Sequence, residues 1–332
     1  MQSQSLLVVL CLLFSLSAAR AEEPAGQPAN QDDAIRKGLG FVETKSLAWL
    51  RERKCASCHH VPLMIWVDRE ARQRGFKVDE PGLKEATDFM LAAENRGAII
   101  PKPGDPERAG NGYSLMALFT ILSFRDVGQG PEPAAQEVMK AAAEHLVSKQ
   151  QADGSWMPFL GNPPFRNPEE VSTLLAAFGL VAEPRVGIDA APSATKMREW
   201  LKANSKDEGS QARSLRILID HERKANVELL LQQQNADGGW SQTKEMPSDA
   251  FATGQAIYSL ISRGGIDKSH SAILKARDFL LKTQKPEGSW PMTSRPFNSG
   301  DNKKGSGNLE PITVAGSAWA VLGLLQLTSG TR

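Results

Sequence analysis

Residues 234–240 read Gln-Asn-Ala-Asp-Gly-Gly-Trp, and two near copies of this heptapeptide occur at 150–156 and 284–290. All three follow the pattern Gln-x-x-acid-Gly-x-Trp. A leucine stands four residues before each glutamine, so the two side chains share one face of a helix. The leucines are Leu146, Leu230 and Leu280. Because glycine suits a helix end and a tight turn, the three segments predict three helices that end in the same kind of turn.

Each copy lies between two helical patterns of different character. The segment before the turn carries charged residues, as in 273–280, whereas the segment after it is rich in apolar and small residues. A helix that is apolar on most of its surface is buried, so we expect the first helix of each pair outside and the second inside. The predicted inner helices near the three copies span 171–181, 250–262 and 312–327. The last two copies are 50 residues apart, which is the length of a helical-hairpin repeat.

These motifs resemble the QW repeats of the squalene–hopene cyclase and protein prenyltransferase superfamily. The resemblance is strong for the three copies and weak before residue 140 and around 197–223. It implies an all-α fold, the α/α toroid, in which a ring of inner helices lies within a ring of outer helices. A generic helical solenoid with similar turns is the alternative.

Six hairpins are expected in a single toroid domain that spans residues 31–330. The predicted outer and inner helices pair as 32–53 with 62–74, 79–95 with 112–126, 133–150 with 169–182, 194–204 with 209–222, 224–234 with 248–262, and 271–284 with 311–327. Six pairs suit a closed ring.

The first hairpin carries a different motif at its turn, Cys55-Ala56-Ser57-Cys58-His59. Cys-x-x-Cys-His is the attachment signature of c-type haem, in which the cysteines form thioethers with the porphyrin and the histidine ligates the iron. The motif therefore predicts haem c as cofactor, bound by Cys55 and Cys58, with His59 as the proximal iron ligand. The alternatives are a local disulfide and a partial zinc site formed by Cys55, Cys58 and either His59 or His60, although a structural zinc ion normally needs four ligands.

The haem motif is in register with the repeat. When Leu50 takes the leucine position, Lys54 falls on the glutamine, Cys58 on the glycine and His60 on the tryptophan, without a gap. All outer-to-inner turns lie on one rim of a toroid, so the haem is expected on that rim. Met157 and Met292 follow two of the repeat tryptophans on the same rim, and they are the candidates for a distal iron ligand; an open iron is equally allowed.

Acidic and aromatic residues recur along the inner helices. Glu169, Asp249 and Glu310 each stand nine residues before an aromatic residue, and those aromatics are Phe178, Tyr258 and Trp319. An acid at a helix N-terminus caps free amides and meets the positive end of the helix dipole. Asp249, Glu310 and Tyr258 are nevertheless the candidates for catalytic groups at a cavity, with helix capping and core packing as the alternatives.

The sequence lacks the catalytic motifs of the superfamily that it resembles. Hopene cyclases protonate their substrate with an Asp-x-Asp-Asp motif, and the chain contains no such tetrad. Prenyltransferases hold zinc with Asp, Cys and His, but beyond residue 58 no cysteine remains. The resemblance therefore implies the ring and an apolar cavity, not terpene cyclisation.

The N-terminal residues resemble an export signal. An apolar run at 6–16 is followed by Ala19-Arg20-Ala21, a small-x-small cleavage site. We expect a signal peptide at 1–21, a flexible leader at 22–30, and a periplasmic or secreted protein; a membrane anchor is the alternative, but the run is short for a bilayer. Removal of the signal leaves equal numbers of basic and acidic side chains, so nothing favours a nucleic-acid partner.

These patterns predict an exported haem c toroid that transfers electrons or serves as a redox module, with a redox protein or a small apolar ligand as partner. The corresponding classification is a cytochrome c-like, iron-binding protein of electron transport. The alternatives are an enzyme that uses haem or acids on a ligand in the cavity, and a terpenoid cyclase-like binding module without the cyclase motif. Whether the chain is an enzyme is left open.

Overall fold

The computed structural model describes residues 30–56, 60–95, 112–125, 133–159, 168–182, 188–293 and 309–328. Within these ranges the regular structure is helical, apart from one isolated β-bridge between Trp240 and Asp249. The outer helices are α1 (Gln31–Arg53), α3 (Glu80–Leu91), α6 (Pro133–Ser148), α8 (Ala191–Asn204), α10 (Arg223–Gln232) and α12 (Ser271–Thr283). The inner helices are α2 (Val61–Gln73), α5 (Gly112–Phe124), α7 (Glu169–Ala182), α9 (Ser210–Leu218), α11 (Ala250–Ser262) and α13 (Glu310–Leu325). A short 3-10 helix, η1 (Ala93–Asn95), follows α3.

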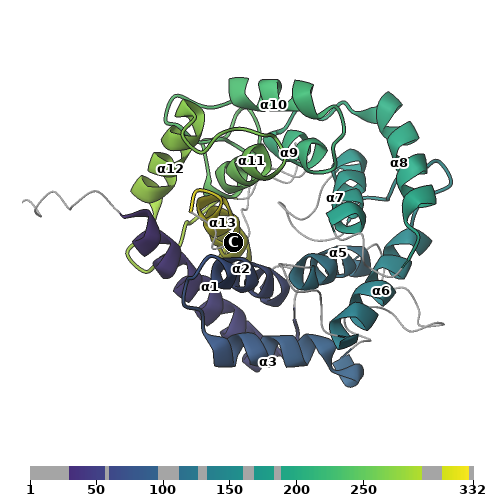
Figure 1. Ribbon diagram of the computed structural model, residues 1–332, viewed down its shortest axis with the longest axis horizontal. Coiled ribbons are helices and arrows are strands. Elements are labelled where there is room, and N and C mark those ends of the chain that lie inside the picture. The colour runs from purple at the N-terminus through teal and green to yellow at the C-terminus, as the bar shows by residue number, and fades with distance from the viewer. Residues whose placement is uncertain are drawn as a thin grey trace, which may run out of the picture.

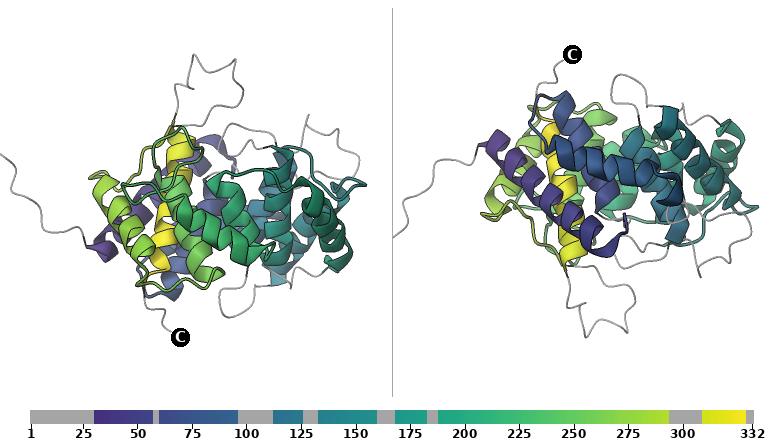
Figure 2. Two further views of the ribbon diagram at one scale, coloured as in Figure 1. Left: turned by 90° about the horizontal axis from the view of Figure 1, so that it is seen from above. Right: turned by 90° about the horizontal axis from the view of Figure 1, so that it is seen from below.

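The helices form two concentric rings, shown down the ring axis in Figure 1 and edge-on in Figure 2. Each inner helix contacts the next one, and the last, α13, contacts both α2 and α1. The ring is therefore closed. The α/α toroid that the resemblance implies is confirmed, with all six hairpins at the expected places in the described ranges, including the three that the motifs cover only weakly.

Four of the inner helices, α5, α7, α11 and α13, are composed mainly of apolar and small residues, whereas α2 and α9 also carry buried charged residues. In α11 every residue from Ala250 to Leu260 is buried. Gly254 of this helix lies against the backbone of α13, where a Cβ would overlap the main chain at Trp319. The two helices approach so closely because glycine has no side chain to separate them.

The tryptophan of each repeat joins three parts of a hairpin. Its indole Nε1 donates to the carbonyl of the repeat leucine at the end of the outer helix, at 2.7–2.8 Å. Its backbone N–H donates to a hydroxyl of the following inner helix. These hydroxyls belong to Thr173, Thr253 and Ser317. The motif thus fixes where the chain turns inward, which explains the burial of all three tryptophans.

The glutamine of each repeat connects neighbouring hairpins. Its side-chain Nε2 donates to the carbonyl of the motif glycine and to a carbonyl in the first turn of the next outer helix. The second acceptors are the carbonyls of Ser193, Ala272 and Ala34, at 2.7–2.9 Å. The bond from Gln284 to Ala34 links the last outer helix to the first and so closes the outer ring.

The first hairpin turns at the position that the register predicts. Helix α1 ends at Arg53, and α2 begins at Val61 with Pro62 in its first turn. His60, at the tryptophan position, is buried and stacks on Trp49 with 4.6 Å between ring centroids. Cys58 and His59 lie outside the described residues, as do the predicted signal and leader up to residue 29. No helix in the described ranges is both long and apolar enough to cross a bilayer.

Candidate functional site

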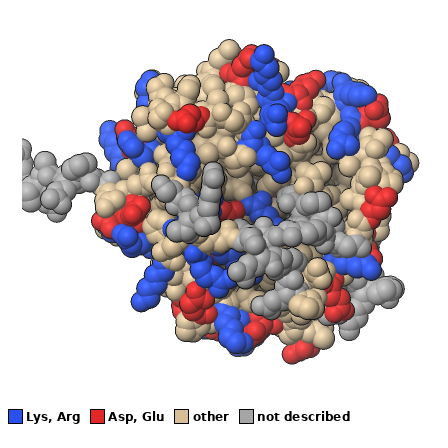
Figure 3. Space-filling view, in the orientation of Figure 1, with Lys and Arg blue, Asp and Glu red and all other residues tan. Residues whose placement is uncertain are grey.

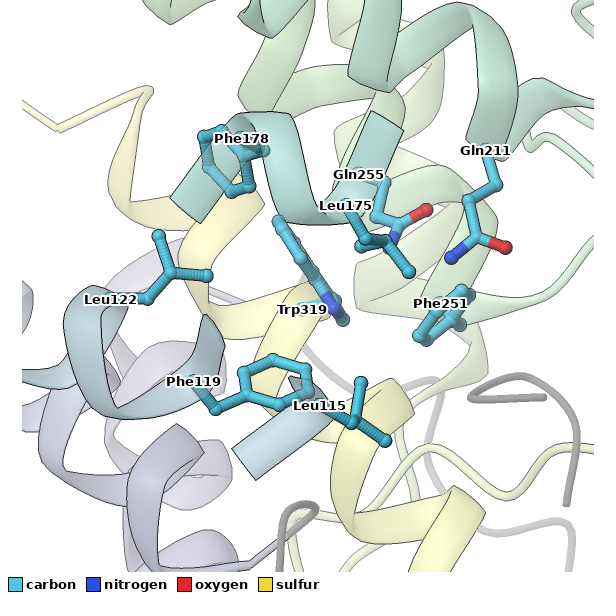
Figure 4. A pocket seen from close by; sticks show the side chains of 9 residues that line it. All are labelled: Leu115, Phe119, Leu122, Leu175, Phe178, Gln211, Phe251, Gln255 and Trp319. Atoms are coloured by element: carbon cyan, nitrogen blue, oxygen red, sulfur yellow. The ribbon is translucent and has the colours of Figure 1, made fainter. Parts of the chain in front are cut away.

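An axial cavity lies inside the inner ring (Figure 4). It is lined by Leu115, Phe119, Leu122, Leu175, Phe178, Gln211, Phe251, Gln255 and Trp319. These residues come from five different inner helices, and none of the nine is charged. The free volume is about 10 Å³, room for about one water molecule. A larger guest therefore requires the side chains of the lining to move apart.

Two amide side chains interrupt the apolar lining. Gln211 of α9 is 4% exposed and Gln255 of α11 is 3% exposed. Figure 4 shows both amides on the same side of the cavity, close to Phe251. The carbonyl oxygen of Gln255 has no hydrogen-bond partner among the described residues. A few convergent polar groups in an apolar cavity are typical of a small-molecule site.

Aromatic side chains form a cluster around Trp319. Trp66, Tyr258 and Phe251 meet Trp319 edge to face, with ring centroids 5.2, 5.8 and 6.3 Å away. Phe178 packs against Trp66 at 6.3 Å. The three aromatics that follow the inner-helix acids by nine residues thus belong to one cluster, because they stand at the same level of the ring.

A buried ion cluster lies beside these aromatics. Arg125 donates to Glu70 at 2.5 Å and to the hydroxyl of Tyr258, and Arg74 donates to the other Glu70 oxygen at 2.6 Å. The Arg125 guanidinium also lies 4.7 Å from the centroid of the Trp66 ring, a cation–π contact. The cluster joins α2 to the end of α5 and to α11.

The ion cluster holds its groups in fixed protonation states. Burial alone would raise the pKa of Glu70, but Arg125 and Arg74 outweigh it and lower that pKa below its usual value. Burial raises the pKa of Tyr258 to about 12, although Arg125 opposes the shift. Glu70 is therefore ionised and Tyr258 protonated at neutral pH.

The structure separates the predicted catalytic candidates. Asp249 is the N-cap of α11: one oxygen accepts from the Ala252 N–H at 2.8 Å and the other from Gln242 at 2.7 Å. Glu310 pairs with Lys45 of α1 at 2.8 Å. Tyr258 lies two helical turns along α11 from Asp249, in the ion cluster. The geometry of Asp249 matches the capping alternative, and none of the three lines the axial cavity.

The predicted iron ligands are placed only in part. Met157 is 56% exposed, whereas Met292 is buried against Gly316 of α13. The side chain of Cys55 is exposed. Since Cys58 and His59 lie outside the described residues, their relation to these side chains is not described.

The sequence did not single out Gln211, Gln255, Glu70 or Arg125. Each lies in or next to a predicted inner helix, but the helices that hold Glu70 and Gln211 carry several other polar and charged residues. Nothing local therefore marked these four side chains. The pairing itself joins residues 55 positions apart and follows no local pattern.

A second buried acid, Asp68 of α2, lies away from the cavity cluster and has no hydrogen-bond partner among the described residues. Burial raises the pKa of Asp68 well above its usual value, and Glu43, Asp79 and Glu80 add to the shift while Arg72 opposes it. The folded state therefore loses stability as the pH rises above the pKa of an unfolded aspartate, since the unfolded chain ionises first.

Replacement of this acid by its neutral isostere tests that conclusion. We expect Asp68→Asn to be more stable than the parent at pH 7, by more than the ~0.5 kcal/mol typical of neutral surface changes. The advantage of the variant should shrink below pH 4, where Asp68 of the parent is protonated in the unfolded as well as in the folded state. Urea unfolding at the two pH values measures it. If Asp68→Asn were less stable than the parent at pH 7, the conclusion that Asp68 is a buried, unpaired carboxyl would be wrong.

Comparisons with known proteins agree with the fold. No family model matches the chain. Drimenyl diphosphate synthase from Streptantibioticus cattleyicolor is 29% identical over 216 residues, which are 64% of this chain and 32% of the synthase. The matched part is thus about a third of the length of that curated relative.

Solved structures with a similar fold include two enzymes of different chemistry. A variant of the type II terpene cyclase MstE from Scytonema, in complex with geranylgeranyl dihydroxybenzoate, has a TM-score of 0.52 at 13% identity and covers 90% of this chain and 98% of that one. An unsaturated glucuronyl hydrolase specific for heparin has a TM-score of 0.54 at 11% identity, with 90% and 96% covered. A protein from Actinoplanes has a TM-score of 0.54 at 14% identity, with 90% and 100% covered.

The prediction of a cytochrome c-like, iron-binding electron-transport protein is wrong on these findings. The similar proteins include a drimenyl diphosphate synthase and a terpene cyclase, and the described residues contain no group of three or more His, Cys, Asp or Glu that could hold a metal ion. Covalent attachment of haem at Cys55, Cys58 and His59 is untested, because two of the three lie outside the described residues. The fold is an α/α toroid, similar to those of a terpene cyclase and a glucuronyl hydrolase.

Proposed function

We propose that the chain binds a small apolar molecule of the terpenoid class in the axial cavity of the toroid. The observation that carries this proposal is the lining, in which seven of nine side chains are apolar and the other two are neutral amides. The likeness to MstE, which was solved with a geranylgeranyl substrate, supports the choice of ligand class.

The energetics favour such a ligand once the cavity opens. Apolar surface contributes about 25 cal/mol per Å² when it leaves water, so ~300 Å² of a short isoprenoid supplies about 7 kcal/mol before the cost of association. Part of that gain is lost because the aromatic side chains must move apart and the ligand must be immobilised. The expected affinity is therefore weaker than micromolar, since a Kd of 1 μM corresponds to about 8.2 kcal/mol.

Protonation chemistry is poorly supported by the groups beside the cavity. An alkene is protonated only by a strong acid, yet the lowered pKa of Glu70 keeps it ionised, and a pKa of about 12 makes Tyr258 a weak donor. The Arg125 guanidinium already occupies a position over the Trp66 ring, where a carbocation would otherwise be stabilised. These features favour a binding module over a cyclase.

A charged sugar is a less suitable ligand, although one similar structure belongs to a heparin-specific glucuronyl hydrolase. Binding a uronate needs cations and several hydrogen-bonding groups, and none of the nine lining residues is charged. Basic and acidic side chains are instead interspersed around the outer ring on the face shown in Figure 3.

A pair of matched variants on α7 tests the proposal. Leu175 lines the cavity, whereas Leu180 is buried on the same helix outside the lining. Leu175→Phe narrows the cavity and is expected to weaken farnesol binding about ten-fold. Leu180→Phe adds the same volume outside the cavity lining and should change the affinity for farnesol about two-fold or less.

Calorimetric titration with farnesol measures both affinities, and thermal unfolding shows that both variants are folded. Equal losses in the two variants would mean that the ligand does not occupy the axial cavity. Absence of farnesol binding to the parent chain would refute the proposal outright.

A further inference from the structure

The carbonyl oxygen of Gln255 is a buried acceptor that faces the cavity without a partner among the described residues. An unpaired buried polar group costs about 1–3 kcal/mol, so native proteins rarely keep one without a ligand or water to satisfy it. Other buried polar atoms of the inner helices also lack partners, but none of them belongs to a residue that lines the cavity. Several of them are hydroxyls, and a hydroxyl rotates to suit its surroundings. The Gln255 amide has no such freedom.

Gln211 places a second amide beside the first. The two residues belong to neighbouring inner helices, α9 and α11, and Figure 4 shows their amides on the same side of the cavity. An amide pair offers both donors and acceptors but no charge. It therefore suits a neutral group that can donate a hydrogen bond to Gln255.

Because the lining carries no charge, two other head groups fit it poorly. A diphosphate or carboxylate would be buried against an amide oxygen with no cation among the nine lining residues, and a buried unpaired charge is strongly unfavourable. The Arg125 guanidinium does not compensate, because Glu70 and Tyr258 already engage it. A pure hydrocarbon would leave the Gln255 oxygen unpaired.

The helix register gives the direction in which such a ligand lies. All inner helices begin on the rim of the outer-to-inner turns. Gln211 is the second residue of α9 and Gln255 the sixth of α11, whereas Phe178 and Leu122 stand tenth and eleventh in α7 and α5. The amides therefore lie nearer that rim than the deepest apolar residues do.

We propose that the ligand is an isoprenoid alcohol, whose hydroxyl donates to Gln255 while its hydrocarbon chain extends toward Phe178 and Leu122. This inference rests on the proposed function, since it names the head group of a ligand in the same cavity. Gln255 is then the residue that distinguishes an alcohol from the corresponding hydrocarbon or diphosphate.

Calorimetric titration of the full chain with farnesol, farnesene and farnesyl diphosphate tests the inference. The parent is expected to bind farnesol about ten-fold more tightly than farnesene and the diphosphate most weakly. Gln255→Met has nearly the same volume and no hydrogen-bonding group, so the preference for farnesol should disappear while farnesene binding stays equal or improves. Its unfolding temperature should not fall, because no described partner is lost.

Gln326→Met is the matched control. Gln326 is a buried glutamine of the last inner segment, outside the cavity lining, where it contacts Arg74. This variant should keep the parent's preference. Equal binding of farnesol and farnesene to the parent, tightest binding of the diphosphate, or a preference that survives in Gln255→Met would overturn the inference and leave the proposed function standing. Failure of both farnesol and farnesene to bind would refute the two together.

Discussion

Gly288→Ala is expected to destabilise the protein by about 3 kcal/mol or more. Gly288 has a φ of +95°, a conformation that costs an L-residue about 1–2 kcal/mol. A Cβ at this position would also overlap the backbone carbonyl of Lys37 in α1. The contact lies where the last outer helix meets the first, so the new methyl group would push apart the joint that closes the ring. Urea unfolding measures the loss.

Gly265→Ala separates the two causes. Gly265 also has a positive φ, +74°, but a Cβ there meets nothing within 4 Å. Its replacement should therefore cost only the backbone strain, about 1–2 kcal/mol. If both variants lost the same stability, the close approach of the turn to the next outer helix would contribute nothing to ring closure.

Glu70→Ala is the second change expected to have a large effect, a loss of about 3–5 kcal/mol. Glu70 is buried and accepts from Arg74, Arg125 and Trp66. Removal of its carboxylate leaves the Arg125 guanidinium buried without a counter-charge, and burial of an unpaired charge is the costly part. Chemical denaturation at neutral pH measures the change.

Two further variants make this expectation specific. Glu85→Ala removes an acid of similar geometry from the exposed pair with Arg51, and it should cost less than about 1 kcal/mol. The double replacement of Glu70 and Arg125 by Met removes both charges and should recover most of the loss. A double variant as unstable as Glu70→Ala would show that the damage is not an unpaired charge.

The fold was predictable because its determinants are local and repeated. The glutamine, glycine and tryptophan of each copy make the same contacts in each hairpin, so a pattern of seven residues implies a turn, its position and its neighbours. Small apolar inner helices follow from composition. Even the first hairpin, which lacks the glycine and tryptophan, turns at the residue that the register indicates.

The site was less predictable because it depends on residues far apart in the chain. The repeated spacing does bring Phe178, Tyr258 and Trp319 into one aromatic cluster, since equal steps along equivalent helices reach one level of the ring. The amides Gln211 and Gln255 and the pair of Glu70 with Arg125 carry no such signature. Asp249, one of the predicted catalytic acids, caps a helix.

The electron-transport prediction failed for a related reason. A five-residue attachment motif indicates a cofactor, but it says nothing about what the surrounding ring does. The redox function was predicted from that motif alone. The proposed terpenoid-type ligand is instead based on the comparisons and on the apolar lining of the cavity.

A crystal structure of the protein soaked with farnesol tests the central claim most directly. The account predicts density for one farnesol molecule inside the inner ring, in contact with Trp319 and with its hydroxyl within hydrogen-bonding distance of Gln255. Farnesol bound outside the ring, or a cavity that stays closed at saturating ligand, would contradict it.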